Sequence, residues 1–496
     1  MPDNKFLYWA GIASVPLLAL VISNEYKARR VTNRKPITSF SAHPEAVPIP
    51  TSTLFEILMW IPNIFSIENP TNSVKEKGLV SRWSLLGLPM IDLGGAEALD
   101  FLSACERQKL LAQNWPSSTV DYLGNVAAVK DGAENTFHRN LISGPFKQPL
   151  LGSYVPQIEE ITRVIVSREL ETSVMDTVDV AKRITISVML GCIFGIKNIT
   201  SADLQAELSE WRLHFQNYQD GLFSVPIDLP FTAFHRGKQS KEWLKQKSIL
   251  LMKEQVIEWE NSGRNPAFET FFVQLYNSKD EFGNPLDEST IGDQAMLMLF
   301  AGHDTSASVI ISLVSFLHDH PDALERVSQE SYDIFGKEPQ RTMQYSDLNK
   351  LTYLDAAIKE TLRIRTPVLR VLKKTLTDLT FDGYHIPANS SLSFNIAGSG
   401  YYYGADKAPV DQFYPERYLD TQHLEDNQLG FTPTLQPFGF GKHSCIGKPL
   451  ALMELKTVIS TFVRLVNFKK VKPHTEFTHF PIAYPKGEML LDISSK

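Results

Sequence analysis

The first 23 residues of the chain differ in pattern from the rest. From Phe6 to Ser23 the sequence FLYWAGIASVPLLALVIS carries no charge, and a membrane-spanning helix needs about 20 such residues. Pro16 would kink this helix, which a bilayer tolerates. A basic cluster follows and, by the positive-inside rule, keeps the next domain in the cytoplasm: Lys27, Arg29, Arg30, Arg34 and Lys35. The pattern predicts a transmembrane anchor over residues 1–35, with its span at about 6–23.

A secretory signal peptide is the alternative interpretation of this apolar run. In a signal peptide the basic residues precede the apolar run and a small-residue cleavage site follows it. Here the basic residues come afterwards, and no such cleavage site is evident. Prolines at positions 36, 44, 48 and 50 then predict a stiff linker over 36–50. We therefore predict a single-pass anchor, a linker and a cytosol-facing domain over 51–496.

Beyond the linker, apolar positions follow helical spacing over long stretches. Residues 51–68 predict an amphipathic or membrane-touching helix, and 152–324 are mostly helical in pattern, with a break at 224–237 that contains two prolines. Other apolar runs predict a hairpin at 81–93 and strands near 376–395 and 476–493. No clean boundary divides residues 51–496. The pattern therefore predicts one large domain that is predominantly α with small β-sheets, an α+β fold.

Charge and cysteine count exclude several classes of function. The 496-residue chain has a formal net charge of -7 and a pI near 6.0, which argues against a nucleic-acid partner because phosphate needs a basic face. Only three cysteines occur, Cys105, Cys192 and Cys445, and they form no CxxC pair. This count excludes a disulfide framework and an all-thiolate zinc or iron–sulfur site.

The stretch FGFGKHSCIGKPLALMELK, residues 438–456, places Cys445 among glycines. A phosphate-binding loop needs Ser or Thr after Gly-Lys, where this chain has His443. A dinucleotide fingerprint needs GxGxxG, but the glycine after Gly439 and Gly441 is Gly447. A cysteine nucleophile needs an oriented base, which adjacency in sequence does not show. None of these three sites is supported.

The same stretch does satisfy what a thiolate metal ligand needs. Its glycines allow the backbone to lie close to a flat ligand, and Pro449 is typical of the first turn of a helix. The amides at a helix N-terminus stabilise a negatively charged sulfur. Cys445 is therefore a candidate metal ligand.

At these positions the chain resembles the haem-binding loop of the cytochrome P-450 superfamily. The matching pattern is Phe438-x-x-Gly441-x-His443-x-Cys445-x-Gly447. The resemblance implies that the Cys445 thiolate is the axial ligand of a haem iron, and that the other four residues bind the haem. It extends over nearly the whole chain after residue 50, and it implies a single haem-thiolate monooxygenase fold behind the anchor.

Upstream, LFAGHDTSAS (299–308) resembles the oxygen-activation segment of this superfamily in its AGxDT form. We expect Gly302 to bind at the cofactor by leaving room for a diatomic ligand. The resemblance assigns Asp304 and Thr305 to catalysis, because a hydroxyl beside an acid can deliver protons to bound oxygen.

Two further segments imply a buried ion-pair network. KETLRIRTP (359–367) carries Glu360 and Arg363 three residues apart, on one helical face. FYPERY (413–418) supplies Arg417 and resembles the PERF element of the superfamily. The resemblance implies that the three side chains brace the cysteine loop through guanidinium–carboxylate bonds.

The resemblance also implies a set of residues that hold the haem propionates. Arg139, in the segment 115–146, matches the propionate-binding arginine. Four residues earlier the superfamily usually has Trp or His, but this chain has Asn135, and His443 stands where Arg is commoner. A further arginine is expected beyond Glu360, for which Arg370 or Lys373 could serve.

The function implied is that of a membrane-anchored haem-thiolate monooxygenase of the endoplasmic reticulum and of secondary metabolism. It would use O2 and electrons from NADPH, delivered by a separate flavoprotein reductase, to hydroxylate a lipophilic substrate. Segments 115–124 and 221–240 are similar to the subgroup that oxidises retinoids, sterols and plant steroid hormones, so we expect an isoprenoid. Candidate pocket residues are Tyr122, Leu299, Phe300, Val368, Leu369 and Ile482.

Two alternatives stay open from the sequence. The first is a reductase-independent haem-thiolate isomerase or dehydratase, whose members commonly lack the threonine that this chain retains at Thr305. The second is a non-catalytic haem- or sterol-binding membrane protein, which would need neither Asp304 nor Thr305. We also hypothesise that Lys442, Lys448 and Lys456 form a basic face for the reductase; a solvated charged face is the alternative.

Overall fold

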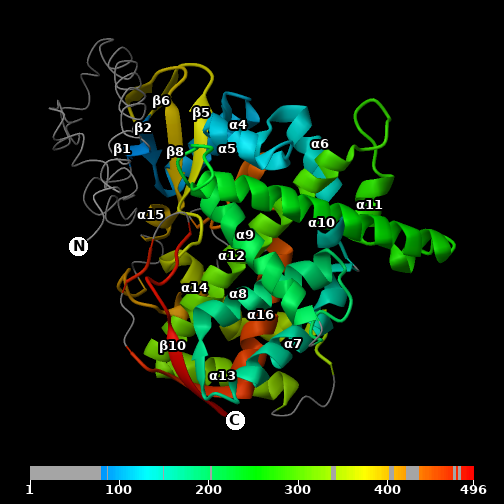
Figure 1. Cartoon of the computed structure of the whole chain (residues 1–496). Helices are drawn as coiled ribbons and strands as arrows, with labels where there is room; N and C mark the ends of the chain where they lie inside the picture. The colour runs from blue at the N-terminus through cyan, green and yellow to red at the C-terminus, as the bar shows by residue number, and fades with distance from the viewer. Residues whose placement is uncertain are drawn as a thin grey trace, which may run out of the picture. The chain divides into compact units, whose positions relative to one another are not determined.

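The computed structural model of the chain describes residues 80–85, 88–148, 150–201, 204–336, 342–401, 407–419, 435–472, 476–478 and 482–496. The predicted anchor, linker and helix at 51–68 lie outside these residues. The described residues form two compact units. The first, here called the sheet unit, contains residues 80–114 and 370–399. The second, the helical unit, contains residues 115–369 and 400–496 (Figure 1).

The sheet unit contains a five-stranded sheet in the order β1-β2-β8-β5-β3, in which β2 and β8 run parallel and the other pairs antiparallel. A separate hairpin of two strands turns at Asp382 and Gly383, both with positive φ, as a two-residue turn requires. The elements are β1 (Val80–Leu85), β2 (Leu88–Leu93), α4 (Gly95–Arg107), β3 (Leu111–Gln113), β5 (Arg370–Thr375), β6 (Leu379–Phe381), β7 (Tyr384–Ile386) and β8 (Ser391–Asn395). Helix α15 (Ile396–Tyr401) follows β8 and leads into the helical unit.

The helical unit consists mainly of helices packed around α12, whose residues are almost all buried. Its α-helices are α5 (Ser117–Leu123), α6 (Gly132–Ile142), α7 (Leu150–Glu169), α8 (Thr177–Val188), α9 (Gln205–Leu222), α10 (Ala233–Asn261), α11 (Phe271–Asn277), α12 (Glu288–Asp319), α13 (Pro321–Phe335), α14 (Thr352–Ile364) and α16 (Lys448–Leu465). By length and composition α12 alone, among the described residues, could span a membrane, but 78% of its apolar window is buried in the protein.

Shorter elements complete the helical unit. A small antiparallel sheet has the order β4-β10-β9. The elements are the π-helix η4 (Met189–Ile193), the 3-10 helices η2 (Ala127–Val129), η3 (Gly144–Phe146), η6 (Pro266–Phe268), η7 (Tyr345–Lys350), η8 (Pro415–Tyr418) and η9 (Gly441–His443), and the strands β4 (Val174–Asp176), β9 (Val466–Lys470) and β10 (Leu490–Ser495).

Side-chain caps explain where several of these helices begin. Asp287 accepts a bond from the Thr290 amide at the start of α12, and Thr232 accepts one from the His235 amide at the start of α10. Because of the second cap, helix resumes at Ala233, four residues before the end of the break predicted at 224–237. Helix α14 is capped from outside, since the Glu330 carboxylate of α13 accepts the amides of Tyr353 and Leu354 at 2.7 and 2.9 Å.

The predicted fold class, predominantly α with small β-sheets, is confirmed. The hairpin predicted at 81–93 is the antiparallel pair β1 and β2. Strands β3 and β4 were not predicted, because three residues are too few to establish an alternating pattern. Strand β9 was missed because it follows α16 directly, with Val466 already extended at φ -132 and ψ 143.

Candidate active site

Two glycines shape the loop that carries Cys445. Gly439 and Gly441 have φ of 72° and 64°, in the left-handed region that favours glycine. The turn lets the Cys445 amide donate to the Phe438 carbonyl at 2.8 Å, which closes the loop. Predicted residues Phe438, Gly441 and Cys445 therefore belong to one backbone-defined loop.

The thiol of Cys445 lies at the N-terminus of α16. The amides of Gly447 and Lys448 donate to the sulfur, and Pro449 occupies the first helical turn as expected. Burial raises the pKa of the thiol, while these two amides and the Arg139 guanidinium oppose that rise. Nevertheless Cys445 is exposed. The protein therefore surrounds the thiol with donors while the residue as a whole stays accessible to solvent.

Arg139 and His443 connect the cysteine loop to α6 and to the segment just before it. Arg139 Nη1 donates to the Ser444 carbonyl at 2.8 Å. His443 Nε2 donates to the Lys130 carbonyl at 2.9 Å and lies 3.6 Å from Asp131 Oδ1. The imidazole therefore uses this nitrogen to fasten the loop to the segment before α6; a role at a propionate stays a prediction for His443 as it does for Arg139.

Asn135 occupies a position at which the superfamily usually has Trp or His, and its side chain bonds within the protein. Its side-chain amide donates to the Ala127 carbonyl at 2.8 Å. Its Oδ1 is buried without a partner in the described residues, and an amide oxygen accepts rather than donates. Asn135 therefore ties α6 to η2 through its amide nitrogen, and a propionate contact at this position stays untested.

The buried stretch of helix α12 contains one patch that is more accessible to solvent. From Thr290 to Leu317 every residue is buried except Phe300, Ala301, Gly302 and Thr305. Ala301 and Thr305 lie four residues apart and so share a face, and the Thr305 hydroxyl donates to the Ala301 carbonyl at 2.7 Å. Helix α12 also packs against α16, the helix that begins beside Cys445.

Gly302 lies against the π-helix η4. A Cβ at this position would lie 2.3 Å from the Met189 Sδ. The missing side chain therefore permits α12 to pack against Met189. The predicted space for a diatomic ligand at Gly302 stays a prediction.

Asp304 is buried and receives donors from several elements. Gln219 of α9 donates its amide to Oδ2, and the Tyr484 hydroxyl lies 2.9 Å from Oδ1. Lys182 Nζ of α8 lies 3.9 Å from the same oxygen, and His303 Nε2 lies 3.5 Å from it. We call Asp304 and these four side chains the Asp304 cluster.

Glu360, Arg363 and Arg417 are brought together in a fully buried network. Arg363 bonds the Glu360 carboxylate through two nitrogens at 2.7 and 2.9 Å, and Arg417 Nε bonds it at 3.0 Å. Other N–H groups of the two arginines donate to backbone carbonyls within residues 408–412. The network thus fixes the 408–412 segment directly, and its bracing of the cysteine loop stays a prediction.

Arg370 and Lys373 both belong to strand β5 of the sheet unit. Arg370 pairs with the buried Asp92 carboxylate at 3.3 Å, and Lys373 pairs with Glu106 at 3.1 Å. Each cation therefore neutralises an acid of its own unit. A propionate contact for Arg370 stays a prediction.

The predicted pocket residues divide into two groups. Phe300 is half-buried beside Ala301, and Val368 is 43% exposed. Leu299 and Ile482 are buried core residues. Tyr122 is buried too, and its hydroxyl donates to the Tyr218 carbonyl at 2.9 Å between Gly221 and Gly237. Tyr122 therefore fixes α5 against the α9–α10 pair.

Among the buried ionisable groups that sequence reasoning missed are His303 and Glu454. Glu454 of α16 is 1% exposed, burial raises its pKa to about 8, and it bonds the Ser306 side chain of α12. Its spacing was a usable signal, because Leu450, Glu454 and Val458 are four apart on one apolar face. His303 gave no such signal.

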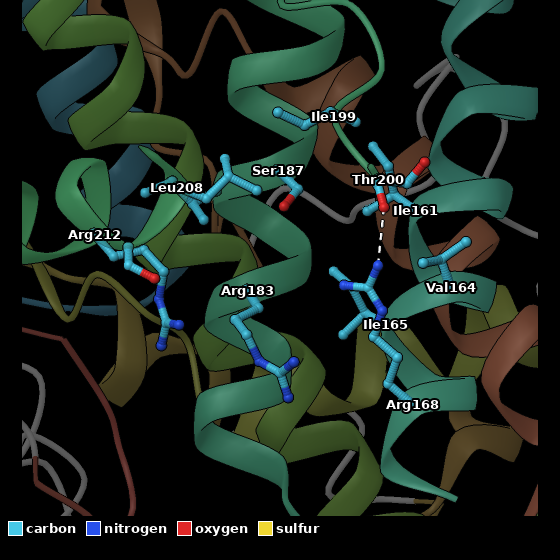
Figure 2. Close-up of a pocket in the computed structure, with 12 residues that line it drawn as sticks. Ile161, Val164, Ile165, Arg168, Arg183, Ser187, Ile199, Thr200, Leu208 and Arg212 are labelled. Atoms are coloured by element: carbon cyan, nitrogen blue, oxygen red, sulfur yellow. Dashed lines mark hydrogen bonds between the residues drawn. The ribbon is translucent and has the colours of Figure 1, made fainter. Parts of the chain in front are cut away.

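A small separate pocket lies between α7, α8 and α9 (Figure 2). Its lining includes Arg168, Arg183 and Arg212 but none of the predicted site residues. Arg168 donates to the Thr200 carbonyl at 2.9 Å, and the other two arginines pair with Asp179. This pocket is therefore not the candidate active site.

The residues around Cys445 fit a haem. Residue Cys445 is exposed, and α12 leaves Ala301 exposed and Thr305 half-buried within an otherwise buried stretch. Gly447 has an ordinary φ of -80°, and a Cβ there would make only ordinary contacts, 3.7 Å from Phe146 and 3.8 Å from the Cys445 sulfur. Neither backbone strain nor protein packing requires this glycine, whereas a flat group against the loop does.

The fold and this site define a haem-thiolate oxidoreductase. The sequence model of the family described as cytochrome P450 matches residues 50–490, so the chain belongs to the cytochrome P450 family. Its cofactor is haem, with the iron held by a cysteine thiolate.

Individual relatives come from animals and from cyanobacteria. Cytochrome P450 26A1 of Xenopus laevis is 29% identical over 421 residues, which cover 82% of each chain. The putative cytochrome P450 120 of Synechocystis is 26% identical over 91% of this chain and 98% of its own length. The solved structure of retinoic acid bound cyanobacterial CYP120A1 matches with a TM-score of 0.74 at 25% identity, over 86% of this chain and 93% of that one.

Proposed function

We propose that the chain is a monooxygenase that hydroxylates a lipophilic isoprenoid, with a retinoid-like acid as the first candidate. The observation that carries the proposal is the exposed Ala301–Thr305 face of α12, next to a buried acid and packed on the helix that begins beside the Cys445 thiol. A protein that only binds haem would need neither the hydroxyl nor the acid. When bound, haem supplies oxygen activation and C–H oxidation.

The side chains of the site divide the remaining tasks. The Gly447 and Lys448 amides, with the Arg139 guanidinium, favour the ionised Cys445 sulfur. The Thr305 hydroxyl can turn from the Ala301 carbonyl and donate its proton on the exposed face of α12. Asp304, next in sequence, can return a proton to that hydroxyl from its buried cluster.

Substitution of Asp304 and Thr305 tests this division. Asp304→Asn and Thr305→Ala should each lower product formed per NADPH at least tenfold, with electrons appearing as hydrogen peroxide instead. Thr305→Ser keeps the hydroxyl and should restore most of the coupling. Equal coupling in Thr305→Ala and wild type would contradict the proposed proton donor.

The substrate proposal rests on the relatives. The solved structure of the cyanobacterial relative is described as retinoic acid bound, and the half-buried Phe300 gives the Ala301 face an apolar neighbour. Binding spectra with retinoic acid, retinol, a sterol and a linear fatty acid should show the largest shift to high spin with a retinoid. A larger shift with the fatty acid would contradict the isoprenoid class.

Electrons are proposed to come from NADPH through a separate flavoprotein reductase. Of the three lysines suggested for its docking, Lys456 is bound to Asp355 at 2.7 Å, so it is removed from the proposed face. Lys442 is exposed, and Lys448 lies half-buried beside Cys445. Lys442→Glu should weaken reductase-driven turnover several-fold without changing the haem spectrum. The matched control is Lys472→Glu, an exposed lysine after β9. Equal effects at both positions would argue against docking at Lys442.

The anchor and its location in the endoplasmic reticulum are proposed from the sequence of residues 1–35. Deletion of those residues should move the expressed protein from the membrane pellet to the supernatant while keeping the haem spectrum. A deletion variant that stays in the pellet would contradict residues 1–35 as the only anchor.

A further inference from the structure

His303 is buried between helix α8 and the Asp304 carboxylate. Its Nδ1 lies 2.7 Å from the Thr185 hydroxyl of α8, and its Nε2 lies 3.5 Å from Asp304 Oδ1. The Phe215 ring of α9 packs edge-on against the imidazole, with the ring centres 5.0 Å apart. The side chain is 4% exposed. Packing therefore fixes one ring nitrogen toward a hydroxyl and the other toward a carboxylate.

The imidazole is neutral at physiological pH. Burial lowers the pKa of His303 to about 4; Asp304 opposes that change, while Lys182 and Arg212 add to it. The other ionisable group at the cluster is Tyr484, whose pKa is raised well above its usual range by burial and by Asp304. A neutral imidazole carries a single N–H, so the ring must place it either toward Thr185 or toward Asp304.

The two placements differ in electrostatic energy. With the proton on Nδ1, the bare lone pair of Nε2 would face a carboxylate oxygen. With the proton on Nε2, the ring presents an N–H to that oxygen, and the Thr185 hydroxyl donates to Nδ1 in place of its bond to the Ala181 carbonyl. Both placements give Thr185 an acceptor or a donor, but only the second turns an N–H rather than a lone pair toward the carboxylate oxygen 3.5 Å away, so the second is favoured.

We infer that His303 is a positioning residue for Asp304: Thr185 selects the Nε2–H form, and that N–H orients the Asp304 carboxylate. The inference deepens the proposed function, because it rests on Asp304 as the group that returns a proton to Thr305. Gln219, Tyr484 and Lys182 bind the same carboxylate from other elements. Loss of the imidazole donor should therefore let the carboxylate turn out of this orientation without breaking the cluster.

A matched pair of substitutions isolates the imidazole donor. His303→Gln places an amide N–H near the position of Nε2, whereas His303→Asn ends near Nδ1 and leaves Asp304 without the donor. On α8, Thr185→Val removes the hydroxyl at nearly constant volume, and Thr185→Ser keeps it. His303→Asn and Thr185→Val should each lower product per NADPH about fivefold at pH 7. His303→Gln and Thr185→Ser should restore most of the coupling.

The second measurement does not depend on turnover. Histidine 15N spectra of the ferrous carbon-monoxide form, with His303→Asn used to assign the signal, should show His303 protonated on Nε2 in wild type and in Thr185→Ser. A signal protonated on Nδ1 in wild type overturns the inference. The product-per-NADPH assays of these variants use the substrate that gives the largest spin-state shift in the panel described above.

The outcomes separate this inference from the proposed function. If Asp304→Asn uncouples turnover but His303→Asn and His303→Gln behave alike, the inference fails and the role of Asp304 stands. If Asp304→Asn leaves coupling unchanged, both fail. Equal urea midpoints for the Gln and Asn variants would show that their difference in coupling is not a loss of stability.

Discussion

The cysteine loop and the Asp304 cluster each surround one acidic group with donors, but the loop uses backbone amides and the cluster uses side chains. At the loop, two backbone amides donate to the Cys445 sulfur, and glycines at positive φ shape the turn that precedes it. At the cluster, side chains from α8, α9, α12 and the segment around Tyr484 surround one carboxylate. A site built from backbone is contained in a short stretch of sequence. A site built from side chains of distant segments is assembled only by the fold.

The largest effect is expected from the Cys445 side chain of the loop. Cys445→Ser replaces the thiolate with a weakly acidic hydroxyl and should abolish the thiolate-type band in the carbon-monoxide difference spectrum. Retention of that band would refute Cys445 as the ligand.

A second test uses the buried Glu360 network, which is built from side chains as the Asp304 cluster is. Arg417→Ala leaves the Glu360 carboxylate with one guanidinium fewer and should lower the free energy of unfolding by about 3–5 kcal/mol, measured by urea titration of the haem-bound protein. The control is Lys486→Ala, whose pair with Glu476 is largely exposed. A similar loss in both variants would argue against a special role for burial.

Glu454 lies between the two regions, on α16 and against Ser306 of α12. Burial raises its pKa from 4.5 to about 8 in the folded chain, so the unfolded chain releases this proton first. The contribution of Glu454 to the free energy of unfolding is therefore fully present below pH 4.5 and is lost as pH rises toward 8. Glu454→Gln should gain on the order of 3 kcal/mol at pH 7 and flatten the dependence of urea midpoint on pH between 5 and 8. The exposed Glu281→Gln serves as control; an unchanged slope in Glu454→Gln would contradict a buried neutral carboxyl.

The backbone character of the loop predicts a contrast between two of its glycines. Gly441→Ala forces a side chain into the left-handed region and should cost about 1–2 kcal/mol of unfolding free energy. Gly447→Ala has no such strain and should change haem content more than it changes the urea midpoint. The reverse ranking would show that Gly447 serves the protein alone.

The smallest effect is expected from a single donor of the Asp304 cluster. Tyr484→Phe removes the hydroxyl 2.9 Å from Oδ1 while three other side chains remain, so product per NADPH should fall only about threefold. Tyr276→Phe, at a 45% exposed residue, is the control. A loss of product per NADPH as large as that of Asp304→Asn would mean that the other three side chains cannot hold the Asp304 carboxylate without Tyr484.

This contrast also explains what the sequence could predict. The Cys445 loop, the AGxDT segment and the Glu360–Arg363 spacing are each local, so their residues were found before the fold was known. His303 and Glu454 were missed because their partners, Thr185 and Ser306, lie on other helices. The sheet unit gave no boundary in sequence because it joins two segments separated by more than 250 residues.

The contact between Gly302 and Met189 has the same origin. The AGxDT segment identifies Gly302, but the Met189 that it contacts belongs to η4, more than 100 residues earlier in the chain. A motif identifies which residues matter, whereas the fold decides what each one contacts.

The contact between Gly302 and Met189 changes how mutational scans of this segment should be interpreted. Any side chain at Gly302 would meet the Met189 sulfur, so either the Met189 side chain or α12 would have to move. Inactivity of a Gly302 variant alone would therefore not distinguish this displacement from a lost role at the cofactor. Tolerance at Gly302 should instead return when Met189 is made smaller, so paired libraries at these two positions would distinguish a packing requirement from a catalytic one.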